Sequence, residues 1–443
     1  MRRPETGVLV LGGGIAGMQA AIDLGNMGFR VYLLERSPSI GGRMAQLDKT
    51  FPTNDCAICI LAPKMRECFD HPQVTTLTYA EMVGLSGQMG EFKALVRLKP
   101  RYVDLDKCTG CGECLAKCPV KVPNDFNMGL DKRKAIYMPF MQAVPKKMTI
   151  DAARCMQLTR GKCGNCKKVC QAGAIDYDQK ERTTELNVAA VVLSTGFDVY
   201  DVSALSQYGY GRIKNVITAM EFERLICASG PTHGHLTRPS DHAIPESVAF
   251  IQCAGSRNLK HKPYCSSVCC MHATKEAILA SEHYPDLKPY IFHMDMRAVG
   301  KGFYKYVERA KTDYRVTYIR SRPGEIREDA QGNPVLWYED TATGEVKNLT
   351  VGLVVLAQAL LPSRGNQEIS DIVGVPLDEY GFFKRADKLL RPVDTVREGV
   401  FACGFCQSPQ DIPDSVTQAS GTAARVAEVL GEHVGKKKVG TAW

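Results

Sequence analysis

Two consecutive runs of four closely and regularly spaced Cys constrain the fold of this chain more than any other feature. The first run is Cys108-x2-Cys111-x2-Cys114-x3-Cys118, followed by Pro119. This spacing is typical of ligands to [4Fe–4S] clusters, which exchange one electron each. Zinc sites also use Cys-x2-Cys pairs, but four staggered Cys that end in Cys-Pro and are then repeated favour iron–sulfur. The chain is therefore expected to transfer single electrons.

The second run, Cys155-x7-Cys163-x2-Cys166-x3-Cys170, follows closely. In two-cluster ferredoxins, the last Cys of each run ligates the cluster of the other run. The expected ligand sets are Cys108, Cys111, Cys114 and Cys170 for one [4Fe–4S] cluster, and Cys118, Cys155, Cys163 and Cys166 for the other.

The composition is that of an ordinary globular chain. At 443 residues, with 44% hydrophobic and 23% charged side chains, it should hold two or three domains. Eighteen Cys would suggest disulfides in a small secreted protein, but the N-terminus lacks the pattern of a signal peptide. The Cys are thus expected to be reduced and to ligate metal in a cytoplasm. No apolar run reaches the ~20 residues that a membrane span needs, so any membrane contact would involve a partner.

The formal charge of +8 is scattered along the chain rather than gathered in a long basic run. Bound clusters and a dinucleotide would also offset much of it, because both are anionic. We therefore expect no nucleic-acid binding.

The N-terminal segment has the pattern of a Rossmann unit. An apolar strand over residues 7–11 is followed by a glycine-rich loop, a helix, a second strand over residues 31–34 and an acid, Glu35. The glycines allow a tight turn and close approach of a pyrophosphate to the helix N-terminus, while the acid accepts hydrogen bonds from ribose hydroxyls. The expected contacts of this loop are Gly12, Gly14, Ile15, Ala16 and Gly17.

Three later segments resemble those of the two-dinucleotide-binding-domain flavoproteins, which bind FAD rather than NAD at this first site. They are Gly41 to Met44, Val191 to Gly196, and Gly399 to Gly404 with the helix start after it. That helix N-terminus would favour an anionic reduced flavin. The further FAD contacts that this resemblance implies are Arg36, Gly42, Arg43, Thr195, Gly196, Gly404, Asp411, Ile412 and Pro413.

The domains are expected to be nested, because the FAD strands lie at both ends of the chain. The expected class is α/β, a thioredoxin-reductase-like two-dinucleotide-binding-domain (Rossmann-like) flavoprotein with an inserted two-cluster ferredoxin-like α+β domain. Its parts are the FAD-binding domain in three pieces (1–98, 186–240 and 356–443), the ferredoxin-like insertion (99–185) and a degenerate nucleotide-binding domain (241–355).

The degenerate domain has thiols where a phosphate loop would stand. Its first strand leads into Gln252-Cys253-Ala254-Gly255-Ser256-Arg257, which lacks the glycine fingerprint and disfavours NADPH binding there. Buried Cys can be simple packing residues, but four within 18 positions predict a third cluster. Its expected ligands are Cys253, Cys265, Cys269 and Cys270.

The combined motifs resemble the A-type subunit of heterodisulfide reductase and its relatives over nearly the whole chain. The motifs are Asp55-Cys56-Ala-Ile-Cys59-x4-Lys64-Met65, Phe250-Ile-Gln-Cys253-Ala-Gly-Ser-Arg257, Tyr264-Cys265-x3-Cys269-Cys270 and Asp411-Ile-Pro-Asp414. In that family a [4Fe–4S] cluster replaces the nucleotide site. A Lys after the Cys-Cys pair approaches the flavin there, and the resemblance assigns this role to Lys275, with Glu223 from the preceding helix.

The resemblance implies an oxidoreductase component that uses FAD and iron–sulfur clusters for electron bifurcation or confurcation. The implied partners are heterodisulfide-reductase B/C-type subunits, a hydrogenase- or dehydrogenase-linked small iron–sulfur subunit, ferredoxin, and a second copy of the chain. The short chain looks like the bacterial-type form, which also occurs in quinone-interacting and benzoyl-CoA reductase complexes, so the acceptor stays open. The alternatives are a self-contained NAD(P)H-dependent flavoenzyme and an assembly scaffold with structural cofactors.

The remaining Cys have several interpretations. Cys56 and Cys59 could contact the flavin, form a redox dithiol, help to hold a shared cluster, or be buried thiols. Cys403 and Cys406 resemble a dithiol beside flavin, but packing is the simpler interpretation. Cys68 has no assigned role.

Overall fold

The apolar runs at the start of the chain form parallel strands of one large sheet, in a computed structural model that describes residues 7–440, with side chains to residue 431. The domain limits expected at residues 1 and 443 lie outside this range. Strand β1 (Gly7–Leu11) lies between β2 (Val31–Glu35) and β10 (Arg182–Leu193) and runs parallel to both. Every residue of β1 is buried, as expected for the centre of a parallel sheet.

The same sheet gathers strands from both ends of the chain. Strand β3 (Val74–Thr78) pairs with β2, and β23 (Val400–Ala402) pairs with β10, both in parallel. The sheet continues through β22 (Arg391–Thr395) to β21 (Arg385–Asp387), and on its other branch through β5 (Phe92–Leu98) to β4 (Ala80–Ser86). The nested FAD domain expected from the sequence is therefore a single sheet.

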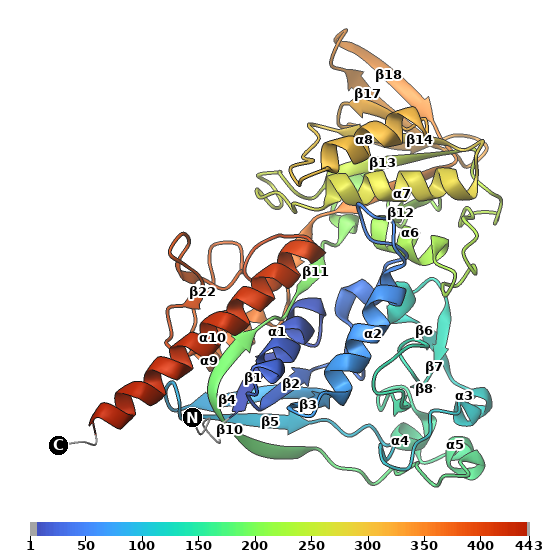
Figure 1. Ribbon diagram of the computed structural model, residues 1–443. Coiled ribbons are helices and arrows are strands. Elements are labelled where there is room, and N and C mark those ends of the chain that lie inside the picture. The colour runs from blue at the N-terminus through green and yellow to red at the C-terminus, as the bar shows by residue number, and fades with distance from the viewer. Residues whose placement is uncertain (1–6, 441–443) are drawn as a thin grey trace. The chain divides into compact units, whose positions relative to one another are not determined.

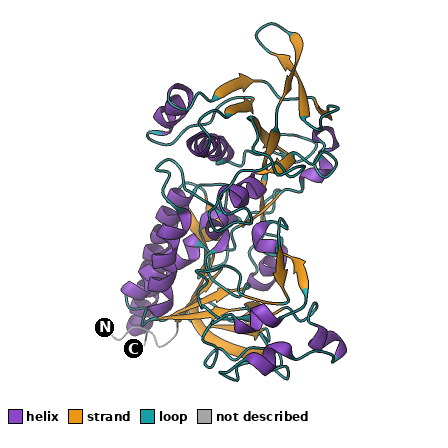
Figure 2. Ribbon diagram, turned by 90° about the vertical axis from the view of Figure 1, so that its right-hand side faces the viewer, coloured by secondary structure: helices purple, strands orange, loops and turns teal. Residues whose placement is uncertain are grey.

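Helices cover this sheet. Helix α1 (Ile15–Asn26) connects β1 to β2 and packs along α10 (Ile412–Gly440), the long red helix of Figure 1. Figure 2 shows the same long helix standing against the strands. Helix α2 (Ala57–Asp70) precedes β3, and α9 (Asn366–Val373) packs on β4. Short 3₁₀ helices, η1 (Gly42–Gln46) and η5 (Gly404–Cys406), stand at the loops that follow β2 and β23.

The segment with the two Cys runs is inserted between β5 and β10. These two strands pair in antiparallel fashion, and their last pair joins Leu98 to Arg182, so the insertion leaves and returns at adjacent points. It consists mostly of loops (Figures 1 and 2). Its regular elements are α3 (Glu113–Lys117), α4 (Met156–Arg160), α5 (Asn165–Val169), β6 (Lys121–Pro123), β7 (Lys132–Lys134), β8 (Ile136–Tyr137), β9 (Thr149–Ile150) and η2 (Asp125–Asn127).

One buried Arg fastens the insertion to the sheet. Arg101 donates to the carbonyl of Pro38 at 2.9 Å and to the hydroxyl of Thr78, and also to Thr149 inside the insertion. Burial lowers its pKa to about 10. Arg101 therefore links the insertion to the FAD domain, and its removal would leave the buried Pro38 carbonyl without this donor.

The chain divides into two compact units. One comprises residues 1–45, 59–197 and 362–443, and the other comprises residues 46–58 and 198–361. The domain boundaries expected from the sequence stay predictions. The second unit has a parallel five-stranded sheet in the order β12 (Val216–Thr218), β19 (Leu353–Gln358), β13 (Ser247–Ala254), β14 (Lys288–His293) and β15 (Thr317–Arg320).

The second unit also contains an antiparallel sheet and three helices. The antiparallel sheet consists of β16 (Glu325–Glu328), β17 (Pro334–Asp340) and β18 (Glu345–Thr350), and the helices are α6 (Ala219–Ile226), α7 (Cys269–His283) and α8 (Phe303–Thr312). The 3₁₀ helices η3 (Val202–Ala204) and η4 (Ser206–Tyr208) precede β12, and strands β11 (Phe197–Val199) and β20 (Leu360–Pro362) pair with each other. No helix among residues 7–440 is long and apolar enough to cross a membrane.

Candidate flavin and iron–sulfur sites

The turn from β1 into α1 tolerates no added side-chain atom at two glycines, Gly12 in the loop and Gly17 in the first turn of α1. A Cβ on Gly17 would lie 1.9 Å from the Gly12 carbonyl oxygen, and a Cβ on Gly12 would lie 2.3 Å from the Ser194 carbonyl oxygen. Gly12 also has a φ of +108°, which side chains with a Cβ rarely adopt. These two glycines allow the backbone at Gly12 to pack against both Ser194 and the first turn of α1.

The N-terminus of α1 is open to an anionic ligand. Gly14 caps the helix without any side-chain hydrogen bond, and no acidic residue occupies the first turn. The free N–H groups at the residues after Gly14, including Ile15 and Ala16, therefore point out of the helix with the positive end of its dipole. A Cβ on Gly14 would meet no atom closer than 4.0 Å, so this side of the loop has room for a pyrophosphate.

Glu35 stands at the end of β2 beside this loop. Its carboxylate accepts hydrogen bonds from the N–H of Gly13 and the N–H of Ser37, both at 2.8 Å. A carboxylate has about four acceptor positions, so two remain for ribose hydroxyls. Arg36, the next residue, is exposed.

The other expected FAD contacts from β2 and β10 also lie at this edge of the sheet. A Cβ on Gly42 would lie 2.9 Å from the Cα of Gly14. The Arg43 side chain donates to the Phe197 carbonyl at 3.5 Å, and Thr195 donates to the Asn366 side chain at 2.6 Å. Gly196 has open space around it.

The C-terminal segment completes the same edge. A Cβ on Gly404 would lie 2.8 Å from the Ala16 Cβ, so η5 approaches the first turn of α1. The Asp411 carboxylate accepts a hydrogen bond from the Asp414 N–H at 2.9 Å and so caps α10, which Ile412 and Pro413 begin. Burial raises the pKa of Asp411. The structure thus brings together, within one unit, the residues expected to bind FAD.

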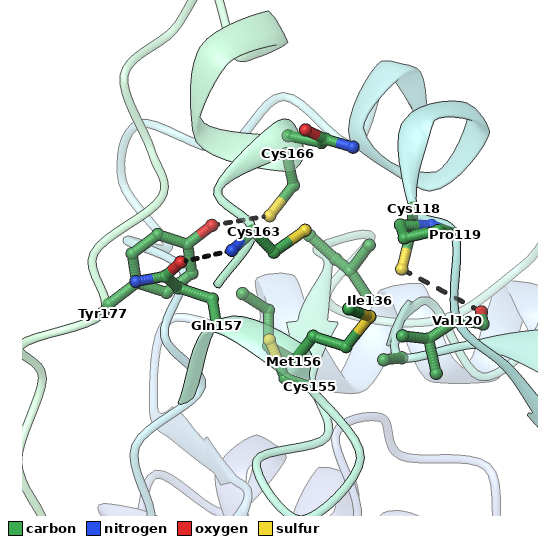
Figure 3. Close-up of a pocket in the computed structure, with 13 residues that line it drawn as sticks. Cys118, Pro119, Val120, Ile136, Cys155, Met156, Gln157, Cys163, Cys166 and Tyr177 are labelled. Carbon is green, nitrogen blue, oxygen red and sulfur yellow. Dashed lines mark hydrogen bonds between the residues drawn. The ribbon is translucent and has the colours of Figure 1, made fainter. Parts of the chain in front are cut away.

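The eight Cys of the insertion line two separate pockets. Cys108, Cys111, Cys114 and Cys170 line one of them. Cys118, Cys155, Cys163 and Cys166 line the other, shown in Figure 3. This grouping has the same crossed pattern as the ligand sets expected from the sequence.

Both pockets have the chemistry of a metal cluster site. Six of the eight Cys lie in or against an apolar core with residues such as Val103, Ile136 and Ile150, whereas Cys111 is exposed and Cys163 half-buried. Burial raises the pKa of Cys114 to about 12, so without a metal its thiol would keep its proton, which a cluster would displace. In Figure 3 the Tyr177 hydroxyl points at the Cys166 sulfur, 2.9 Å away, where it can donate to a thiolate.

The third Cys set lies in the second unit, with Cys253 at the end of β13, Cys269 and Cys270 at the start of α7, and Cys265 in the loop that joins them. Cys253 has a φ of +58°, an uncommon conformation that clusters at functional sites. Cys269 forms sulfur hydrogen bonds with Cys253 and with Cys270, and the first of these lowers the pKa of Cys253 to about 6. The Cys265 sulfur accepts from the Ser267 N–H at 3.3 Å. Three of the four expected ligands, Cys253, Cys269 and Cys270, thus touch, and the fourth, Cys265, lies in the loop before α7.

The two residues expected to act at the flavin form a buried ion pair in the second unit. The Lys275 ammonium on α7 donates to a carboxylate oxygen of Glu223 on α6, and the side chains are 1% and 0% exposed. Burial opposes ionisation of Glu223, but Lys275 and the hydrogen bond from His272 outweigh it and lower the pKa of Glu223 to about 2. The backbone N–H of Asp48 donates to the second carboxylate oxygen at 2.8 Å.

Sequence reasoning missed two members of this group, His272 and Glu276. The Nε2 of His272, on α7, lies 2.7 Å from a carboxylate oxygen of Glu223. Glu276, also on α7, is fully buried. Neither Glu276 oxygen accepts a hydrogen bond from the described residues, although the His272 Nε2 lies 3.6 Å from one of them. Burial, followed by repulsion from Glu223, raises the pKa of Glu276 well above the usual range. The signal was present: His272, Lys275 and Glu276 have the i, i+3, i+4 spacing of one helix face.

The other Cys differ in exposure. Cys59 is exposed and Cys56 half-buried, and both are disulfide-bonded rather than free. Cys403 and Cys406 are fully buried free thiols, and burial raises the pKa of Cys406 to about 11. The Cys406 thiol donates to the Leu193 carbonyl at 3.3 Å, which is what a packing residue does. Cys68 is a buried thiol whose pKa burial raises to about 12.

Fold and site together define a class of protein: a thioredoxin-reductase-like flavoprotein with an inserted iron–sulfur domain, and so an oxidoreductase. The FAD dependent oxidoreductase family matches residues 7–57, and the 4Fe-4S binding domain family matches residues 101–124. Its cofactors are FAD and [4Fe–4S] clusters. Solved thioredoxin reductases share the fold at low identity. That of Lactococcus lactis is 16% identical with a TM-score of 0.53, covering 97% of this chain and 100% of its own. That of T. acidophilum is 15% identical with a TM-score of 0.54, covering 98% and 100%.

The chain belongs to the family of A-type subunits of heterodisulfide reductase. It is 49% identical to the A-type iron–sulfur subunit of the CoB–CoM heterodisulfide reductase of Methanocaldococcus jannaschii, over 95% of this chain and 63% of that protein. It is 46% identical to the A-type subunit of the H(2):CoB-CoM heterodisulfide,ferredoxin reductase of Methanothermobacter marburgensis, over 95% of this chain and 63% of that protein. The chain therefore spans less than two thirds of the length of these relatives. The sequence-based assignment to the family is confirmed.

Proposed function

We propose that the chain is the electron-branching subunit of a larger oxidoreductase complex, working by flavin-based bifurcation or confurcation. Its two-electron donor would bind a partner chain, and its electrons would leave singly toward ferredoxin and toward a disulfide-type acceptor, or an acyl-CoA- or quinone-linked one. The observation that carries this proposal is the presence of three separate Cys sets, two of which line separate pockets of the insertion, in one chain with glycine loops suited to FAD.

The chemistry of the cofactors supports this proposal. When bound, FAD exchanges electrons in pairs or singly, and each cluster exchanges one. Of two electron pairs from the donor, two electrons would pass to ferredoxin and two to one disulfide, which also takes up two protons. The Cys ligands would hold the clusters in the three sets described above, and the protein would keep the routes apart.

We propose that Lys275 and Glu223 act on the flavin as a charge pair. Their support is the family resemblance, which places a Lys after the Cys-Cys pair near the flavin, together with the burial of both charges, because buried charged groups with shifted pKa values are frequent at functional sites. The partners that we propose are heterodisulfide-reductase B/C-type subunits, a small iron–sulfur subunit of a hydrogenase or dehydrogenase, and ferredoxin. Relatives named as ferredoxin-linked heterodisulfide reductases motivate this choice.

The test is anaerobic purification of the tagged chain with whatever remains bound, followed by an assay with a two-electron donor and both acceptors. We expect donor oxidation to require ferredoxin and the second acceptor together. Oxidation with either acceptor alone at the full rate would contradict branching. Bleaching of the flavin by NADPH in the isolated chain would instead favour the self-contained flavoenzyme. The loop at Cys253 argues against that alternative, because it lacks the glycine fingerprint of a nucleotide site.

A further inference from the structure

Two lysines of the insertion reach back to the backbone of the cluster-binding loops. The Lys147 ammonium donates to the Cys108 carbonyl at 2.5 Å, and the Lys134 ammonium donates to the Cys118 carbonyl at 2.6 Å. Lysine side chains usually extend into water, and fixing one in a single conformation costs side-chain entropy. Two such contacts on the carbonyls of two Cys therefore require an explanation.

The two lysines serve different pockets. Cys108 lines the pocket that contains Cys170, whereas Cys118 lines the pocket that contains Cys163. Each pocket therefore has one of the two lysines on the backbone of one of its Cys.

Neither ammonium pairs with an acid among the residues that the structure describes. The ion pairs of this part of the chain include neither Lys147 nor Lys134, although neighbouring Arg133 pairs with Asp151 at 2.9 Å. Both lysines are half-buried, so water screens their charge less than it screens that of an exposed lysine.

The charge has a definite consequence for a cluster in either pocket. Reduction adds one negative charge to the cluster, and a fixed positive charge nearby stabilises the reduced form more than the oxidised one. Net charge and hydrogen bonding are among the factors that set the potentials of iron–sulfur clusters. A lysine that donates a hydrogen bond to the backbone of a ligating Cys contributes both a positive charge and a hydrogen bond near the cluster.

We propose that Lys147 raises the reduction potential of the cluster on Cys108, Cys111, Cys114 and Cys170, and that Lys134 raises that of the cluster on Cys118, Cys155, Cys163 and Cys166. This inference rests on the proposed function only in requiring that both clusters bind. It assigns to the two lysines the control of how readily each cluster accepts an electron.

The experiment compares Lys147→Gln and Lys134→Gln in the full chain, purified anaerobically, by redox titration followed by electron paramagnetic resonance. The matched controls are Lys146→Gln and Lys132→Gln, which remove the same charge from exposed neighbouring residues. Cys111→Ser and Cys163→Ser, which each remove one expected ligand, assign the two midpoints. Lys147→Arg and Lys134→Arg change the side chain but keep its positive charge. A midpoint potential that shifts in the Gln variant and not in the Arg variant therefore reports the loss of charge rather than a change in fold.

We expect each Lys→Gln variant to reduce the equilibrium constant for reduction of its own cluster roughly tenfold, which is about 59 mV for one electron. The Arg variants should stay near the parent protein, and the controls should shift neither midpoint by a comparable amount. Midpoints that stay in place in the Gln variants, or a Lys134→Gln shift in the cluster that Cys111→Ser removes, would overturn the inference. A preparation without cluster signals would contradict the proposed function as well.

Discussion

Replacement of Lys275 by Met should destabilise the second unit strongly, because it leaves the Glu223 carboxylate buried without its cation. Both side chains are nearly inaccessible to water, and breaking a buried ion pair by removing one partner costs about 3–5 kcal/mol. For a unit of this size, each kcal/mol shifts the melting temperature by about 2–4 °C. The melting temperature of that unit should therefore fall by ~6–20 °C.

Differential scanning calorimetry of the anaerobic protein measures this effect, with two comparisons. Lys49→Met breaks a half-exposed pair with Glu282 at 3.4 Å and should cost no more than about 1 kcal/mol. The double variant Lys275→Met with Glu223→Gln removes the stranded charge and should recover part of the loss. A Lys275→Met protein that melts within 2 °C of the parent would refute the view that Glu223 is ionised and depends on Lys275.

Three further predictions follow from the geometry. Gly17→Ala should abolish FAD binding, because the added Cβ would lie 1.9 Å from the Gly12 carbonyl oxygen. The control Gly421→Ala, on α10 where a Cβ meets nothing within 4 Å, should keep FAD and gain up to about 1 kcal/mol in stability. Flavin absorbance after gel filtration measures FAD binding in both variants. Cys118→Ala should remove the signal of the cluster with Cys163 and spare that of the cluster with Cys108, as iron content and electron paramagnetic resonance can show, and loss of the Cys108 signal alone would disprove the crossed assignment. The pKa of Glu276 is raised in the folded protein, so its contribution to the stability of the parent should fall as pH rises above about 4.5, the ordinary pKa of Glu. Glu276→Gln should not show this loss. A difference in melting temperature between parent and variant that stays constant from pH 5 to pH 8 would contradict the prediction.

The local motifs were predictable because their physical requirements lie within short stretches of sequence. The glycines of the first loop indicate a close backbone approach, and the structure places Gly12 and Gly17 where no side chain fits. The insertion was predictable because the FAD-binding motifs lie on both sides of the two Cys runs in the sequence, and in the structure the runs lie between β5 and β10 of one sheet. The thioredoxin-reductase-like fold expected from these motifs is confirmed.

Contacts that depend on tertiary structure could not be predicted in the same way. Arg101 contacts Pro38 and Thr78, which are distant in sequence, and nothing in the local pattern marks it among the basic residues of the insertion. The same holds for Lys134 and Lys147, which look like ordinary surface charges until the loops fold. Glu276 required knowledge that α6 packs on α7 and buries both carboxyl groups together.

The cofactor content of the anaerobically purified chain tests the central claim most directly. Flavin, iron and acid-labile sulfide should be measured on one sample, together with the electron paramagnetic resonance spectrum of the reduced protein. The account predicts one FAD and three [4Fe–4S] clusters per chain, with signals that Cys111→Ser, Cys163→Ser and Cys269→Ser remove one at a time. A preparation with full flavin but fewer than three clusters, or with zinc in place of iron, would contradict it.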